Sequence, residues 1–65
     1  MNKISLRAAR VNKGFTQEAA AKAINRSVSA IKSWENGKTF PKQPDIEKLC
    51  ALYEVTYDSI DFYIA

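Results

Sequence analysis

The feature that most limits the fold of this chain is a pair of short helical patterns separated by only three residues, 25–27. The stretch 16–37 reads TQEAAAKAINRSVSAIKSWENG, and each pattern begins after a good helix cap, Thr16 or Ser27. Asn25 tolerates a positive φ better than any residue except glycine, so it can end the first helix and turn the chain. The connection is too short for the helices to stack antiparallel along their lengths. The sequence therefore predicts two helices that cross at a steep angle, the helix-turn-helix arrangement.

A steep crossing brings two backbones close together and needs small side chains at the contact. Ala20 and Ala21 supply them, and Ile24, Ile31 and Trp34 are expected to fill the space beneath, with Trp34 largely buried. The other side of the second helix carries no comparable apolar group and consists of Val28, Ser29, Lys32 and Ser33. Taken alone, this side is most simply interpreted as an ordinary solvated helix face.

The whole pattern predicts a compact all-α domain of five helices, with residues 1–65 as one domain and the helix pair at about 16–37. The expected helices are Asn2 or Ser5 to Lys13, Gln17 to Ile24, Ser27 as cap to about Asn36, Asp45 to Tyr53, and Tyr57 to about Phe62. The segment 38–44 contains both prolines and is predicted to be a loop.

Composition argues against several classes of protein. A chain of 65 residues forms one small domain, which buries only about 60% of its unfolded surface. A single cysteine and no histidine exclude an internal disulfide and the usual zinc frameworks, and no metal or cofactor is expected. We expect neither an enzyme nor a small-molecule substrate, because there is no glycine-rich phosphate loop and no recognisable acid pair. The chain has no apolar run of about 18 residues and no signal-peptide pattern, which favours a cytoplasmic protein without a membrane span.

Charge is divided unevenly along the chain. Residues 1–44 contain nine Lys or Arg and two acids, a balance of +7, whereas residues 45–65 contain one Lys and five acids, a balance of −4. A basic half and an acidic half favour an anionic partner on one face of the molecule, with solvated surface charge as the alternative.

One ordered set of residues extends from the helix pair almost to the end of the chain. It consists of Gln17, Ala21, Ile24, Ile31, the run Trp34-Glu35-Asn36-Gly37, and then Pro44, Ile46, Leu49, Cys50, Val55, Thr56, Asp58 and Ile60. This set resembles the Cro/cI-type (XRE family) helix-turn-helix domains of phage repressors and bacterial regulators, and it implies a lambda-repressor-like fold. Two positions depart from the family pattern: Asn25 replaces the usual turn glycine, and Ala20 replaces a large apolar residue.

The resemblance implies roles for individual residues in binding double-stranded DNA. The third helix of such domains lies in the major groove, so the residues expected at base edges are Val28, Ser29, Lys32 and Ser33. Phosphate contacts are implied for Gln17, Asn36, Lys38 and Lys42. Structural roles are implied for Ala21, Trp34, Arg10 and Glu35, the last two as an ion pair that is either buried or a weak surface pair. Lys22 and Arg26 are expected to be solvated.

The sequence thus favours a sequence-specific DNA-binding transcriptional regulator, a repressor of phage or mobile-element type. It is expected to be a monomer in dilute solution and a homodimer on an inverted repeat. The apolar residues Phe62, Tyr63 and Ile64 are expected either to supply part of the dimer interface or to pack on the first helix. The alternative function is an antitoxin-like or adaptor module in which a protein partner covers part of the same surface.

Overall fold

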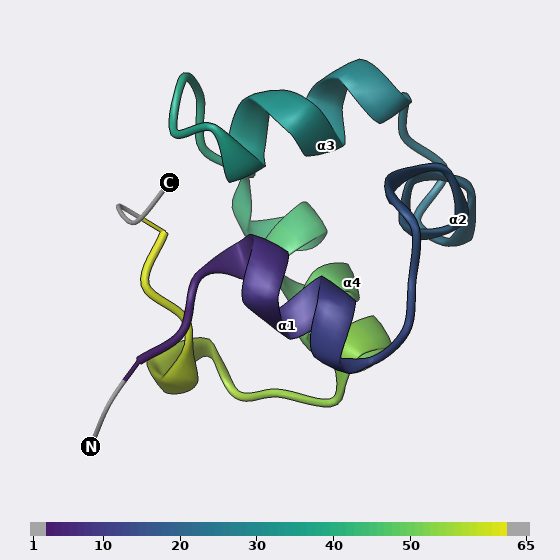
Figure 1. Ribbon diagram of the computed structural model, residues 1–65. Helices are drawn as coiled ribbons and strands as arrows, with labels where there is room; N and C mark the ends of the chain where they lie inside the picture. Colours follow the sequence, from purple (N-terminus) through teal and green to yellow (C-terminus); the bar gives the residue numbers. More distant parts are fainter. Residues whose placement is uncertain (1–2, 63–65) are drawn as a thin grey trace.

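Each of the first three helices of the fold has an N-cap residue with a hydroxyl side chain. The computed structural model describes residues 3–62 and contains α1 (Leu6–Asn12), α2 (Gln17–Ala23), α3 (Val28–Glu35), α4 (Gln43–Tyr53) and the 3-10 helix η1 (Tyr57–Ser59) (Figure 1). Ser5, Thr16 and Ser27 each accept a hydrogen bond from the amide N–H three residues later, at 3.0, 3.0 and 3.2 Å. These bonds satisfy donors that a helix start leaves free, which explains why the helices begin where they do.

The turn between α2 and α3 has the predicted geometry. Asn25 lies in the left-handed region with φ 58°, and the next amide, that of Arg26, donates to the carbonyl oxygen of Ala21 at 2.8 Å. Ala20 and Ala21 are buried where the two helices pack. In Figure 1, α2 is seen nearly end-on beside α3, which runs across the view. The steep crossing is therefore present, and the small alanine side chains permit it.

The core lies between this helix pair and the helices α1 and α4. Its buried apolar residues are Leu6, Ala9, Ala20, Ala21, Ile24, Ile31, Leu49, Tyr53 and Ile60. Trp34 is not among them, because it is only partly buried and packs against the edge of the core. Ile31 takes the central position of α3, and Trp34, three residues later, borders the loop that contains Thr39 and Phe40. The prediction that Trp34 is largely buried is wrong.

Helix α4 begins two residues before the predicted start and includes Pro44 in its first turn. Proline is tolerated there because the first amides of a helix have no partner within the helix. The predicted loop therefore ends at Lys42, which is the N-cap of α4.

The predicted fifth helix is reduced to the single 3-10 turn η1. After it, Ile60 is extended and forms a parallel bridge with Ile4. The amide of Ile4 donates to Ser59 at 3.0 Å, and the amide of Asp61 donates to Ile4 at 2.9 Å. These long-range bonds replace those that a helix would make, so the described part of the chain is all-α with four α-helices rather than five.

Candidate nucleic-acid interface

Helix α3 presents a narrow polar stripe to the outside. Ser29, Lys32 and the C-cap Asn36 are exposed, and their spacing of three and four residues places them on one face. On the opposite face, Ile31 is 1% exposed and Glu35 is 5% exposed. The helix is thus anchored through its inner face, while its outer face is open to a partner.

The four residues expected at base edges do not lie equally on this stripe. Ser29 and Lys32 are fully on it. Val28 is partly buried and packs against the core, and Ser33 is partly buried with its hydroxyl 2.8 Å from the hydroxyl of Thr39. The structure therefore brings Ser29 and Lys32 together at the open face and places Val28 and Ser33 at its edges.

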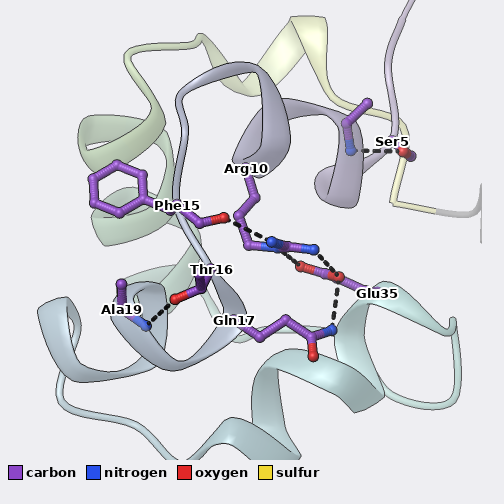
Figure 2. Close-up of polar contacts among 8 residues, drawn as sticks. Ser5, Arg10, Phe15, Thr16, Gln17, Ala19 and Glu35 are labelled. Atoms are coloured by element: carbon purple, nitrogen blue, oxygen red, sulfur yellow. Dashed lines mark hydrogen bonds and ion pairs between the residues drawn. The ribbon is translucent and has the colours of Figure 1, made fainter.

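Arg10 and Glu35 form a buried ion pair beneath the end of this stripe, so the alternative of a weak surface pair does not apply. The Nε atom of Arg10 donates to Oε2 of Glu35 at 2.7 Å, and the adjacent Nη2 donates to Oε1 at 3.3 Å. The remaining Nη1 donates to the carbonyl oxygen of Phe15 at 2.7 Å. Figure 2 shows the guanidinium from α1 directed at the carboxylate of α3. Each side chain balances the charge of the other, and together they fix α1 against α3.

Gln17 joins the same network from α2. Its amide Nε2 donates to Oε1 of Glu35 at 3.1 Å (Figure 2). The side chain that was expected to contact phosphate is therefore held in place by α3. This bond uses one of the two protons on Nε2, so the other remains available to a ligand.

An open cavity of about 330 Å³ adjoins this network. It is lined by Arg7, Arg10, Thr16, Gln17, Glu35 and Asn36, and thus brings together two of the four expected phosphate residues, Gln17 and Asn36. The Glu35 carboxylate is compensated by Arg10, so the cavity is not dominated by negative charge.

The other two expected phosphate residues lie in the loop after α3. Lys38 is exposed, and Lys42 lines a second open cavity of about 280 Å³ with Arg26, Ala30, Trp34, Thr39, Phe40 and Asp45. The structure therefore divides the expected phosphate residues between two regions, at the two sides of α3.

Arg26 is exposed, in keeping with its expected solvation, but it also makes an ion pair that sequence reasoning missed. Its Nε atom donates to Oδ1 of Asp45 at 2.9 Å, which ties the turn after α2 to the start of α4. The Asp45 side chain is only 5% exposed. A sequence signal existed: Asp45 precedes Leu49 and Tyr53 at intervals of four residues, which places it on the same face of the helix as these apolar residues. The structure buries all three.

Tyr53 lies close enough to the Arg10–Glu35 pair to be affected by its charges. Burial raises the pKa of the Tyr53 hydroxyl to about 12; the negative charge of Glu35 adds to this increase, and the positive charge of Arg10 opposes it. Phe15 packs on its ring with 6.1 Å between centroids. Among the described residues, the hydroxyl has no hydrogen-bond partner.

No group of residues within 3–62 has the composition and geometry to hold a metal ion. In the same range, every helix is too short or too polar to cross a membrane.

These features define a small all-helical domain with a steep helix pair whose second helix carries an open polar face. A family model described as a helix-turn-helix domain matches residues 4–61. The chain belongs to this family, which is part of the XRE/Cro-like group, and the resemblance drawn from the sequence is confirmed. Membership indicates a DNA-binding regulator, in a family that is typically not enzymatic. Comparisons with curated proteins and with solved structures gave no match.

Proposed function

We propose that this protein is a sequence-specific transcriptional repressor of phage or mobile-element type that reads the major groove with α3. The observation that carries the proposal is the open stripe of Ser29, Lys32 and Asn36 on a helix whose inner face is fixed by Ile31 and Glu35. A helix held rigidly from behind can present its outer side chains to base edges without reordering. Cytoplasmic location follows from this function and stays a prediction.

Base reading is assigned to the residues of α3 according to their exposure. Ser29 can exchange hydrogen bonds with several base edges, and Lys32 can donate to the guanine acceptors O6 and N7. Val28 and Ser33, at the edges of the stripe, are assigned secondary contacts, with Val28 next to a thymine methyl group. Asn36 is assigned to the adjoining phosphate.

Phosphate contacts are assigned to both sides of α3. Gln17 and Asn36 border the first cavity, while Lys38 and Lys42 lie in the loop on the other side. Contacts on both sides of a groove-bound helix position it on the duplex without carrying sequence information themselves.

The test distinguishes residues that contact DNA phosphates from residues that recognise bases. Affinity is measured for the best site and for its single-base variants at several salt concentrations, with the site first selected from random DNA. Lys38→Ala should weaken all sequences by a similar factor and lower the magnitude of the log–log salt slope by about 0.9, because one fewer counterion is released. Ser29→Ala should leave the slope nearly unchanged and relax the preference at one position per half-site by about 1 kcal/mol.

Lys48→Ala provides a matched control, because Lys48 is an exposed lysine on α4 outside both cavities. It should change neither the slope nor the preference. An equal and uniform loss for Ser29→Ala and Lys38→Ala across all variants would contradict base reading by α3.

A protein-interaction module of the antitoxin or adaptor type is the second candidate. It is favoured by the partly exposed aromatic residues beside α3, where Trp34 and the 49% exposed Phe40 line the second cavity. This function predicts no preference among DNA sequences in the experiment above.

A further inference from the structure

The cavity between α1, the start of α2 and the end of α3 is lined by one positively charged side chain, that of Arg7, to which the assignments above give no role. Arg7 comes from α1, is exposed, and lines the cavity together with Gln17 and Asn36. Arg10, one turn later on the same helix, is occupied by Glu35 and by the carbonyl oxygen of Phe15. Within residues 3–62, no ion pair or hydrogen bond engages the guanidinium of Arg7.

The charges and donors around the cavity suit one anionic group. Because Arg10 and Glu35 compensate each other, Arg7 gives the lining a net charge of +1. The Thr16 hydroxyl accepts the amide N–H of Ala19 and keeps its own proton, and Gln17 and Asn36 each have free amide protons. Both oxygens of Glu35, the one acidic side chain in the lining, already accept hydrogen bonds.

We propose that Arg7 is a further DNA-binding residue, which donates to a backbone phosphate held at this cavity between Gln17 and Asn36. The proposal rests on the DNA-binding function proposed above and extends the interface from α2 and α3 to α1. Guanidinium is suited to this role because its fork of N–H donors matches two phosphate oxygens at once. The Arg10–Glu35–Gln17 network fixes the walls of the cavity, so the contact positions the duplex relative to α3.

Three variants test the role of Arg7 on the duplex selected by the unaltered protein. Arg7→Gln should lower the magnitude of the salt slope by about 0.9 and weaken affinity by about tenfold, the loss of one charge-assisted hydrogen bond. Arg7→Lys should keep the slope and lose part of the affinity, because a lysine provides the charge without the fork. Lys48→Gln removes an exposed positive charge outside the cavity and should change neither quantity. Thermal melts of all three should match the unaltered protein, since both residues are exposed.

A second measurement locates the phosphate. In a series of duplexes, single phosphates are replaced one at a time by neutral methylphosphonates. At one phosphate per half-site, the methylphosphonate should weaken binding of the unaltered protein but should not weaken binding of Arg7→Gln any further. The proposal would be overturned if Arg7→Gln and Lys48→Gln had the same salt slope and affinity. It would also be overturned if every methylphosphonate weakened both the unaltered protein and Arg7→Gln equally. Weaker binding of inorganic phosphate by Arg7→Gln with an unchanged slope for DNA would overturn it as well.

The outcomes also separate this proposal from the proposed function. Suppose that the unaltered protein binds all duplexes equally, but Arg7→Gln still lowers the salt slope and is insensitive to one methylphosphonate that weakens the unaltered protein. Sequence-specific recognition would then be contradicted, while the role of Arg7 would be supported. If sequence preference is present and Arg7→Gln has no effect, the role of Arg7 fails alone. If the unaltered protein binds no DNA, both are overturned.

Discussion

At the scale of single residues, Glu35 is the point where three helices meet. Its carboxylate accepts from Arg10 of α1 and from Gln17 of α2, and it belongs to α3 itself. A buried ion pair of this kind adds little net stability, because the desolvation of both charges offsets their attraction. Its role here is to fix the relative positions of the helices that form the proposed interface.

We predict an asymmetric effect of removing this pair. Glu35→Leu leaves the Arg10 charge buried and should lower the free energy of unfolding by about 3–5 kcal/mol, most of what a domain of this size possesses. The double variant Arg10→Met with Glu35→Leu should recover much of the loss, although its DNA affinity should stay low because Gln17 is no longer held. Urea unfolding measures both. Lys13→Met, which breaks the exposed pair with Glu54, should cost no more than about 1 kcal/mol. A double variant as unstable as Glu35→Leu would count against this account.

Tyr53 makes stability depend on alkaline pH. Its folded-state pKa of about 12 lies above the ordinary value of 10, so folding favours the protonated hydroxyl. This contribution is complete below pH 10 and is lost as pH rises from about 10 through about 12. We expect Tyr53→Phe to lose less stability than the unaltered protein over this range, as measured by urea unfolding at each pH. Tyr57→Phe, at a 57% exposed position, should follow the unaltered protein. Parallel stability curves for Tyr53→Phe and the unaltered protein would show that the hydroxyl ionises freely.

At the scale of helices and turns, Asn25 determines how α2 and α3 cross. Its φ of 58° suits glycine and asparagine but not a β-branched residue. Asn25→Val should therefore destabilise the fold by about 1–2 kcal/mol or more, whereas Asn25→Gly should be nearly neutral. Unfolding midpoints in urea provide the comparison. A stable Asn25→Val variant would mean that the turn can adopt another conformation without cost.

Among the helices and turns, the sequence predicted the elements that depend on local contacts and missed those that depend on distant ones. The caps Thr16 and Ser27 and the turn residue Asn25 act on their own neighbours, so local chemistry was sufficient to place α2 and α3. The bridge between Ile4 and Ile60 and the ion pair between Arg26 and Asp45 join distant segments. Helical spacing places Asp45 on the inner face of α4, but no local pattern identifies its partner or the bridge. The predicted burial of Trp34 is too high for a related reason. Helical spacing indicates which side of a helix faces the core, but not how completely neighbouring elements cover a side chain on that side.

The candidate site divides in the same way. Exposure on α3 follows from helical spacing, so Ser29 and Lys32 were predicted correctly as open positions, although their contacts with DNA stay predictions. The hydrogen bonds of Gln17 with Glu35 and of Ser33 with Thr39 depend on how the elements pack. The sequence does not distinguish Arg7 from a solvated residue, because no local pattern sets this arginine of α1 apart.

At the scale of the whole molecule, the length of the proposed recognition helix α3 favours binding of DNA by two copies of the protein. Helix α3 has eight residues and is therefore about 12 Å long, so in a major groove it would cover only a few base pairs. We predict a monomer in dilute solution and a dimer on an inverted repeat with half-sites about 34 Å apart. Sedimentation with and without the duplex measures this, and an isolated half-site is the control. Tight one-to-one binding to the half-site, with no gain from the second, would contradict the prediction.

The expected dimer interface lies partly outside the described residues, because Tyr63 and Ile64 are not among them. Phe62 is described, and it is partly buried against the core with its ring 5.6 Å from that of Tyr57. Its contacts within the molecule favour packing at this end of the fold over a free apolar surface. A dimer interface that includes Phe62 therefore involves only its exposed side.

The bridge between Ile4 and Ile60 makes the described chain nearly a closed ring. A short peptide between residues 62 and 3 would complete the ring, and a cut at the exposed Gly14 would then open it elsewhere, between α1 and α2. In such a circular permutant, α1 would be the last helix of the chain, while α2, α3 and α4 would keep their order. For protein engineering, the bridge thus allows the chain ends to be moved to the exposed turn at Gly14, away from the face that α3 presents.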